Sequence, residues 1–278
     1  MSVTTAKLGP TIGVELSGLS GPELVRPPVA DACRRALDEH GVVVYREVHV
    51  GDEDLIAFSR MLGRVSVVST GEHQYPEIQT ITLDPAKTNA VLASYRQGNF
   101  LWHIDGATEE VPQKATLLTA REVDEAGGDT EFANTYAAFD ALPERERAEL
   151  SGLRVVHSFG AAQLRANPDA SEQEREAWNR VPARVHPLVW TRRDGRRSLL
   201  LGATADEVVG LPREEGRALL DRLLEHATQP QFVLRHHWRR GDLVIWDNTG
   251  MLHRALPFEP TSLRLMHRTT LVGEEAVA

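Results

Sequence analysis

Hydrophobic and polar residues alternate in short runs along most of this chain, and a few longer segments follow a helical period. Alternation with a period of two is typical of strands, whereas apolar residues three and four positions apart indicate a helix. The helical period is clearest in 212–229, where four leucines recur, and in 28–40, which Gly41 can end. Further helices are predicted at 52–62 and 143–150.

Strand-like segments predominate at both ends of the chain, and the predicted helices flank them. The predicted strands are 7–17, 42–45, 78–83, 114–122, 130–133, 188–191, 198–201, 232–238, 242–246 and 264–272. This order favours a mainly β fold, an antiparallel double-sheet barrel of the jelly-roll type, over alternating βαβ units. Because no repeat and no obvious linker divides the chain, we expect a single domain over residues 1–278.

Composition and charge limit the possible partners. The hydrophobic content of 41% permits a sizeable core. The formal net charge of -9 argues against nucleic acid as the partner. No stretch approaches the roughly 18 uninterrupted apolar residues of a membrane span, and the N-terminus lacks a secretory signal. The lone Cys33 cannot form an internal disulfide and lies in a helical pattern, so we expect a packed residue in a cytoplasmic protein.

His103, Asp105 and the distant His253 are the candidate metal ligands. In a strand, residues two apart point to the same face, so His103 and Asp105 can reach one ion. His253 follows the strand-like segment 242–246, and we expect it just beyond a strand end at the barrel mouth. Two imidazoles and one carboxylate form the facial triad of non-haem Fe(II) oxygenases. With eleven histidines in the chain, a structural histidine remains the alternative for each.

Several segments in a fixed order resemble a known family. They are 102–105 (Trp-His-Ile-Asp), 127–130 (Gly-Gly-Asp-Thr), 246–248 (Trp-Asp-Asn) with 252–254 (Leu-His-Arg), and 264–270 (Arg-Leu-Met-His-Arg-Thr-Thr). Together they resemble the taurine dioxygenase and 2,4-dichlorophenoxyacetate dioxygenase (TauD/TfdA) family of Fe(II)- and 2-oxoglutarate-dependent oxygenases. The resemblance extends over 8–273. Residues 210–253 look like the herbicide-degrading branch, and 264–268 like the taurine branch.

The resemblance implies a double-stranded β-helix in which His103, Asp105 and His253 bind Fe(II). It assigns Thr130 and Arg264 to the distal carboxylate of 2-oxoglutarate, which a guanidinium can hold bidentately. The implied reaction consumes 2-oxoglutarate and O2, releases succinate and CO2, and hydroxylates an unactivated C–H bond. An intact carboxylate at Asp105 favours hydroxylation over halogenation.

Arg268 is the predicted anchor for the substrate. It follows Arg264 by four residues, so both can face the barrel interior, whereas His267 has the opposite parity and should face away. In the family, the matching arginine lies near the substrate's anionic group. We therefore expect a small organic anion, namely a sulfonate, sulfate ester or carboxylate, as in taurine catabolism. The alternatives within the same chemistry are an aryloxyalkanoate and an amino-acid-derived or natural-product intermediate.

The region 67–97 matches the family poorly and is predicted to contain a substrate lid. Val68 stands where the taurine enzyme has a substrate-contacting histidine. Because an apolar side chain cannot replace that hydrogen bond, Val68 argues against taurine itself. The candidate pocket residues are Val68, Tyr75, Tyr95, Asn99, Phe100 and Phe159.

Two other classes of protein share parts of this set of candidate site residues. A non-catalytic binding or sensor protein on the same barrel would lack a metal ligand or a co-substrate anchor, yet all five expected positions are occupied. A zinc-dependent hydrolase would need a nearby general base and would leave Thr130 and Arg264 unexplained. Members of the family are often dimers or tetramers, so a homo-oligomer is expected by analogy.

Overall fold

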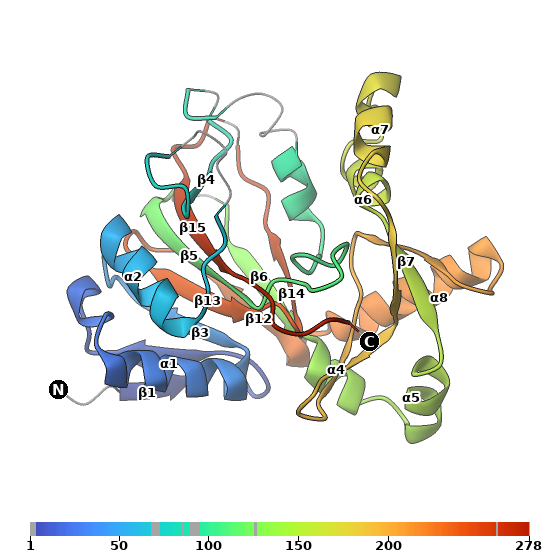
Figure 1. Ribbon diagram of the computed structural model, residues 1–278, viewed down its shortest axis with the longest axis horizontal. Coiled ribbons are helices and arrows are strands. Elements are labelled where there is room, and N and C mark those ends of the chain that lie inside the picture. The colour runs from blue at the N-terminus through green and yellow to red at the C-terminus, as the bar shows by residue number, and fades with distance from the viewer. Residues whose placement is uncertain are drawn as a thin grey trace.

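The computed structural model describes residues 4–67, 73–84, 86–88, 95–124, 127–259 and 261–277. Two facing sheets form a double-stranded β-helix, the jelly-roll core, and helices cover it from outside (Figure 1). The predicted lid is described only in part, and Val68 lies outside the described residues. Within the described part of the chain, every helix is too short or too polar to cross a membrane.

The helices have these bounds: α1 (Pro27–His40), α2 (Asp52–Leu62), α4 (Thr135–Asp140), α5 (Glu144–Leu150), α6 (Phe159–Ala166), α7 (Glu172–Asn179) and α8 (Arg213–Ala227), with 3-10 turns η1 (Gly21–Glu23), η2 (Gln97–Phe100) and η3 (Pro230–Phe232). The strands have these bounds: β1 (Thr4–Lys7), β2 (Val14–Ser17), β3 (Val42–Tyr45), β4 (Gln79–Ile81), β5 (Ala115–Glu122), β6 (Thr130–Asn134), β7 (Arg154–His157), β8 (Arg184–Pro187), β9 (Val189–Thr191), β10 (Arg197–Leu199), β11 (Ala205–Val208), β12 (Val233–His236), β13 (Leu243–Asp247), β14 (Met251–Ala255) and β15 (Leu265–Leu271).

The larger sheet has the strand order β1-β2-β3-β13-β5-β15-β4, and only the β2–β3 pair is parallel. Strand β13 shows how the sheet separates two cores. Leu243 and Ile245 pack toward α1 and α2, whereas Val244 and Trp246 face the interior of the barrel. This alternation is the period-two pattern of a strand with both faces covered. Cys33 is buried in α1, and burial raises the pKa of its thiol to about 12, which confirms a packed residue.

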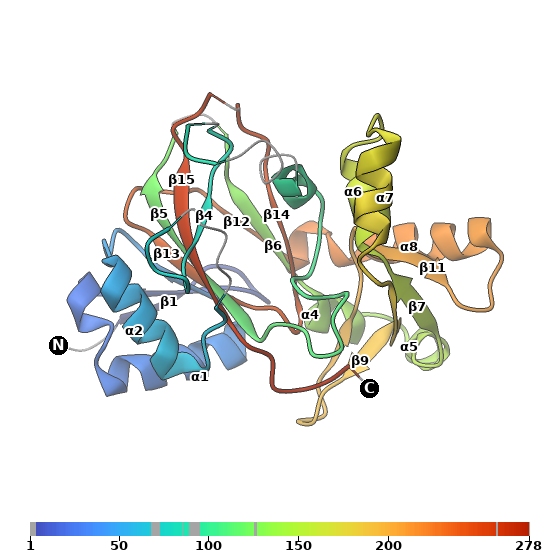
Figure 2. The same ribbon diagram turned by 45° about the horizontal axis from the view of Figure 1, so that its top comes forward.

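The smaller sheet has the order β12-β6-β14 and faces the larger one across the barrel. Phe132 on β6 and Trp246 on β13 meet between the sheets, with ring centroids 5.3 Å apart. The segment from α4 to α8 forms a separate layer beside the barrel, which contains β7, β8 and β11 and the β9–β10 hairpin (Figure 2). Its α8 packs against β11 and α4 in one apolar cluster.

The four predicted helices are confirmed to within two residues as α1, α2, α5 and α8. Gly41 ends α1 in the left-handed conformation, with φ of 70°, which favours glycine. The prediction for His253 was wrong in one respect, because this residue lies in the middle of β14 and not beyond a strand end. The short segment of β14 becomes a strand through pairing with β6, a contact between residues far apart in the chain.

Candidate active site

A backbone bridge brings the two candidate imidazoles together. The amide of His103 donates to the carbonyl of His253 at 3.0 Å, and the amide of His253 donates back at 2.9 Å. This pairing places the ring centroids 4.1 Å apart. Asp105 follows two residues after His103, and its carboxylate lies beside both rings.

The donor atoms of His103, Asp105 and His253 all lie within 4.8 Å of one another. The Nε2 atom of His103 lies 3.9 Å from Oδ1 of Asp105, and Nε2 of His253 lies 3.7 Å from Oδ2. These separations are too long for hydrogen bonds. The three groups therefore converge on a common point without bonding to one another, which is the arrangement that a metal ion requires.

The protonation states suit a metal site. Nδ1 of His103 lies 2.8 Å from the carbonyl oxygen of Leu101, which can only accept, so the proton sits on Nδ1 and Nε2 keeps its lone pair. Burial lowers the pKa of His103, and it lowers the pKa of His253 to about 3, so both rings are neutral. Burial alone would raise the pKa of Asp105, but the guanidinium of Arg268, the two neighbouring imidazoles and the hydroxyl of Thr116 together outweigh it, and the pKa falls to about 2. Two neutral nitrogens and one carboxylate oxygen fit Fe(II).

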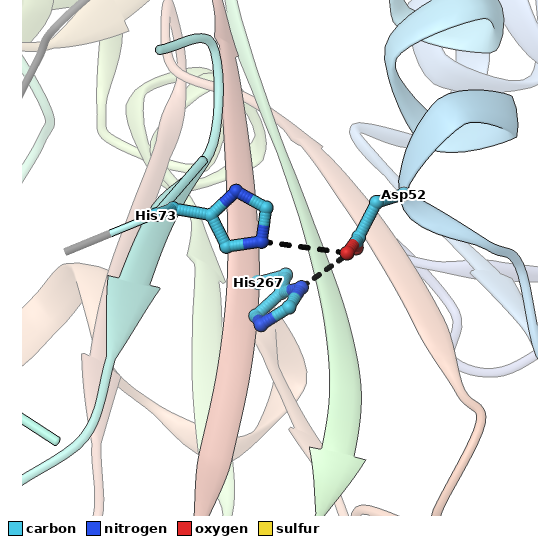
Figure 3. Close-up of side chains that lie close together, drawn as sticks. All are labelled: Asp52, His73 and His267. Carbon is cyan, nitrogen blue, oxygen red and sulfur yellow. Dashed lines mark hydrogen bonds and ion pairs between the residues drawn. The ribbon is translucent and has the colours of Figure 1, made fainter. Parts of the chain in front are cut away.

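A second cluster of two histidines and an aspartate has different hydrogen bonding. Figure 3 shows Asp52, His73 and His267 on the outer side of β15. Nδ1 of His267 lies 2.7 Å from Oδ1 of Asp52, which is a hydrogen bond. The amide of Tyr75 donates to Nδ1 of His73, so the proton of His73 is on Nε2 and points at Asp52. Arg121 also donates to Asp52, as Arg268 does to Asp105. The difference is that the imidazoles of this cluster are bonded to its own carboxylate, so their donor atoms do not converge on a common point for a metal.

Arg264 and Thr130 lie beside the same cavity as the two imidazoles. Arg264 is 4% exposed, and burial lowers the pKa of its guanidinium to about 10. Its Nε donates to the carbonyl of Gly128 at 3.2 Å. The indole N–H of Trp238 donates to Oγ1 of Thr130 at 2.9 Å. Since an indole N–H can only donate, the hydroxyl proton of Thr130 is available to a carboxylate, and the pair fits 2-oxoglutarate.

Arg268 lines this cavity too, but its guanidinium also contacts the carboxylate of Asp105, which parity alone did not predict. Nη2 donates to Oδ2 of Asp105 at 2.7 Å and lies 3.4 Å from Oε1 of Gln113. Arg268 also lines a second, polar cavity with Gln113 and Thr270. The contact joins residues 163 positions apart, so no local pattern could indicate it. His267 points to the opposite side of β15, as its parity predicts.

The other candidate pocket residues divide into two groups. Asn99 and Phe100 line the cavity beside the imidazoles. Tyr95 packs edge-to-face against Phe159 at 5.9 Å, and neither residue belongs to the described lining of that cavity. Tyr75 donates instead to Glu53 at the start of α2.

Sequence reasoning missed several lining residues of this cavity, among them Arg96 and Phe258. Arg96 donates to the carbonyl oxygens of Thr80 and Thr82, so it ties the segment before η2 to β4. Arg96 lies in the predicted lid region 67–97 without having been singled out, Phe258 lies outside the motifs described above, and the fold brings both to the cavity.

Known proteins resemble this chain along its whole length. The family described as "Taurine catabolism dioxygenase TauD, TfdA family" matches residues 4–270. The alpha-ketoglutarate-dependent 2,4-dichlorophenoxyacetate dioxygenase of Cupriavidus pinatubonensis is 36% identical and covers 100% of both chains. The alpha-ketoglutarate-dependent sulfate ester dioxygenase of Pseudomonas putida is 30% identical over 96% of this chain and 88% of its own.

The solved structure of AAD-2 in complex with Mn(II) and N-oxalylglycine covers 100% of both chains, with a TM-score of 0.83 and 30% identity. The likeness therefore extends to the whole fold as well as to the sequence. With the family match over nearly the whole chain, the protein belongs to the TauD/TfdA family of 2-oxoglutarate-dependent dioxygenases.

Proposed function

We propose that this enzyme uses Fe(II), 2-oxoglutarate and O2 to hydroxylate an unactivated C–H bond of a small organic anion, releasing succinate and CO2. The observation that carries the proposal is the convergence of the His103, Asp105 and His253 donors beside the cavity that Arg264 lines. The relative AAD-2 supports it, because Mn(II) and N-oxalylglycine in that structure mimic Fe(II) and 2-oxoglutarate.

Each residue then has a separate task. His103, Asp105 and His253 hold the iron, while Thr130 and Arg264 hold the distal carboxylate of 2-oxoglutarate. When bound, the iron and 2-oxoglutarate supply the oxidising chemistry. The protein supplies orientation and a dry site, since buried groups such as Trp246 and Leu118 form the cavity wall.

Arg268 supports an anionic substrate. Arg268 lines the cavity and is partly buried. Besides the N–H group that donates to Asp105, its guanidinium has further N–H groups that could donate to a carboxylate, sulfonate or sulfate. Relatives named for a chlorophenoxyacetate and for sulfate esters fit this chemistry. Aryloxyalkanoates are the second candidate, which the edge-to-face pair of Phe100 and Phe258 at the cavity favours. Asn99 also lines the cavity and is proposed as a substrate contact.

The remaining proposals concern the whole molecule. We propose a single domain in which the 67–97 region covers the substrate, a cytoplasmic location, and a dimeric or tetrameric assembly like that of family members. Val68, by its matched position, and Tyr95, by its place next to η2, remain proposed contacts of the substrate region.

A substrate panel tests the function. We expect succinate and a hydroxylated or cleaved product with at least one of taurine, longer alkylsulfonates, alkyl sulfates and aryloxyalkanoates, and we expect taurine to be poor. Anaerobic addition of Fe(II) and 2-oxoglutarate should give a weak visible charge-transfer band. No band, together with no succinate from any compound, would refute the oxygenase function. Zinc-dependent turnover without O2 consumption would instead support a hydrolase.

The variant Arg268→Gln should raise the substrate KM roughly tenfold to a hundredfold, because a charge-assisted hydrogen bond to the substrate anion is lost. The KM for 2-oxoglutarate should change less than about threefold, since its distal carboxylate is assigned to Arg264. Steady-state kinetics with each compound varied in turn measures both values. Arg145→Gln, at an exposed ion pair on α5, is the matched control and should change neither. Equal increases in both KM values would contradict the assignment.

A further inference from the structure

Two buried residues behind Asp105 form a hydrogen-bonded chain that ends on its carboxylate. The hydroxyl of Thr116 on β5 lies 2.9 Å from Oδ2 of Asp105. Nδ2 of Asn248, just after β13, lies 3.0 Å from the same hydroxyl oxygen. Thr116 and Asn248 are both 0% exposed, so water does not compete for these contacts. Asn248 belongs to the Trp-Asp-Asn segment of the sequence, and its side-chain amide reaches Asp105 by way of the Thr116 hydroxyl.

The chemistry of the groups sets the direction of this chain. An ionised carboxylate can only accept, so Thr116 must donate its single proton to Asp105. The contact with Asn248 is then possible only if the amide N–H2 of Asn248 is the donor. This requirement holds the amide in one orientation and leaves Oδ1 of Asn248 buried without a partner among the described residues. A buried carbonyl oxygen without a partner costs stability, and turning the amide to relieve it would break the chain.

The chain acts on one of the two carboxylate oxygens. Oδ2 of Asp105 accepts from Thr116 and also from Arg268 at 2.7 Å. Each oxygen lies near one imidazole: Oδ1 is 3.9 Å from Nε2 of His103, and Oδ2 is 3.7 Å from Nε2 of His253. With Oδ2 engaged by two donors, Oδ1 is the oxygen that remains for a metal ion. A carboxylate bound through both oxygens would occupy a position that the facial triad leaves open.

We propose that Asn248 and Thr116 are positioning residues that present Asp105 to the iron through one oxygen only. Asn248 orients the Thr116 hydroxyl, and Thr116 with Arg268 engages Oδ2. The three coordination positions opposite the triad then stay available to 2-oxoglutarate and O2. This inference rests on the proposed iron site, and it extends that site to two residues that contact neither substrate nor co-substrate.

Anaerobic metal titration of matched valine variants tests the proposal. Thr116→Val keeps the shape of the side chain and removes the hydroxyl, so Fe(II) affinity should fall about tenfold, as for other partners of metal ligands. Thr119→Val is the matched control, because Thr119 lies on the same strand, is equally buried, and has a hydroxyl without a partner. It should bind Fe(II) like the wild type, and Thr116→Ser should recover affinity to within about threefold.

The second measurement separates positioning from a general loss of packing. Co(II) in place of Fe(II) reports coordination number through its visible absorption. Thr116→Val should shift this spectrum toward higher coordination, while Thr119→Val should leave it unchanged. If Thr116→Val folds poorly, the same comparison is made on Asn248→Leu, for which we expect about a threefold loss of affinity. Where Thr116→Val does fold, the loss caused by Asn248→Leu should shrink below about twofold in the Thr116→Val background, because Asn248 acts through the hydroxyl.

The outcomes separate this proposal from the proposed function. Wild-type protein that does not bind Fe(II) would overturn the iron site itself. Wild-type binding with equal affinities and spectra for Thr116→Val and Thr119→Val would overturn the positioning role alone. Additive losses from Asn248→Leu and Thr116→Val would also overturn it, since they would show that Asn248 does not act through Thr116.

Discussion

The variant His253→Ala should purify without stoichiometric iron and lose at least about a thousandfold in turnover, a loss equivalent to about 4 kcal/mol of transition-state stabilisation. His253 supplies one of only two nitrogen donors at the site, and burial keeps its ring neutral, the form that binds metal. In this variant only His103 and Asp105 would remain as protein ligands, and two ligands bind iron weakly in competition with water. Iron content after anaerobic loading and succinate formation measure the two effects.

The second histidine cluster provides the control. His267→Ala removes the same side chain from a site with a similar composition, but there the imidazole is hydrogen-bonded to Asp52 (Figure 3). We expect His267→Ala to bind one iron per chain with wild-type affinity. Retention of iron by His253→Ala, or its loss from His267→Ala, would mean that the metal site has been assigned to the wrong cluster.

The variant Arg264→Gln should raise the KM for 2-oxoglutarate by at least about a hundredfold. Two charge-assisted hydrogen bonds to one carboxylate are lost, and each contributes about 1.5–3 kcal/mol. The variant Arg264→Lys should have a KM for 2-oxoglutarate between those of the wild type and Arg264→Gln, because an ammonium group keeps the charge but cannot form two parallel hydrogen bonds to the carboxylate. The measurement is the 2-oxoglutarate dependence of succinate formation at a saturating concentration of substrate.

The stability of the same variant distinguishes a binding role from a structural one. Burial lowers the pKa of Arg264, so the folded protein disfavours its charge, and removing that charge should not destabilise the protein without co-substrate. We expect Arg264→Gln to unfold at the wild-type temperature or slightly above it, and to lose the stabilisation that 2-oxoglutarate gives the metal-loaded wild type. A large drop in melting temperature without co-substrate would contradict the assignment.

Local patterns were sufficient for most helices and for the order of the motifs. The helical period and Gly41 predicted α1, because amphipathic spacing and a left-handed ending are properties of a single segment. The donor residues of the candidate iron site could also be identified, since their chemistry requires particular side chains in a particular order. Val68 shows the limit of this approach, because a departure from the family is visible in sequence while its structural consequence is not.

Pairing between distant segments decided the rest. The even spacing of Arg264 and Arg268 predicted that both side chains lie on one face of a strand, and both do line the cavity. However, Arg264 precedes β15, and the register of the β15–β5 pairing shifts between Leu265 and Met266. The contact of Arg268 with Asp105 depends on that pairing and on the approach of 103–105 to β14. Neither the strand pairing nor the approach of 103–105 to β14 can be recognised in a local sequence pattern, because both depend on which strands pair and in what register.

The sequence by itself identified the candidate metal donors, the two arginines proposed to bind anions and the family to which the protein belongs. The tertiary structure alone decided which of two similar histidine clusters has free lone pairs. It also decided which oxygen of Asp105 is engaged by Thr116 and Arg268. The physical reason is that residue type sets what a group can donate or accept, whereas the direction of a hydrogen bond depends on neighbours that only folding supplies.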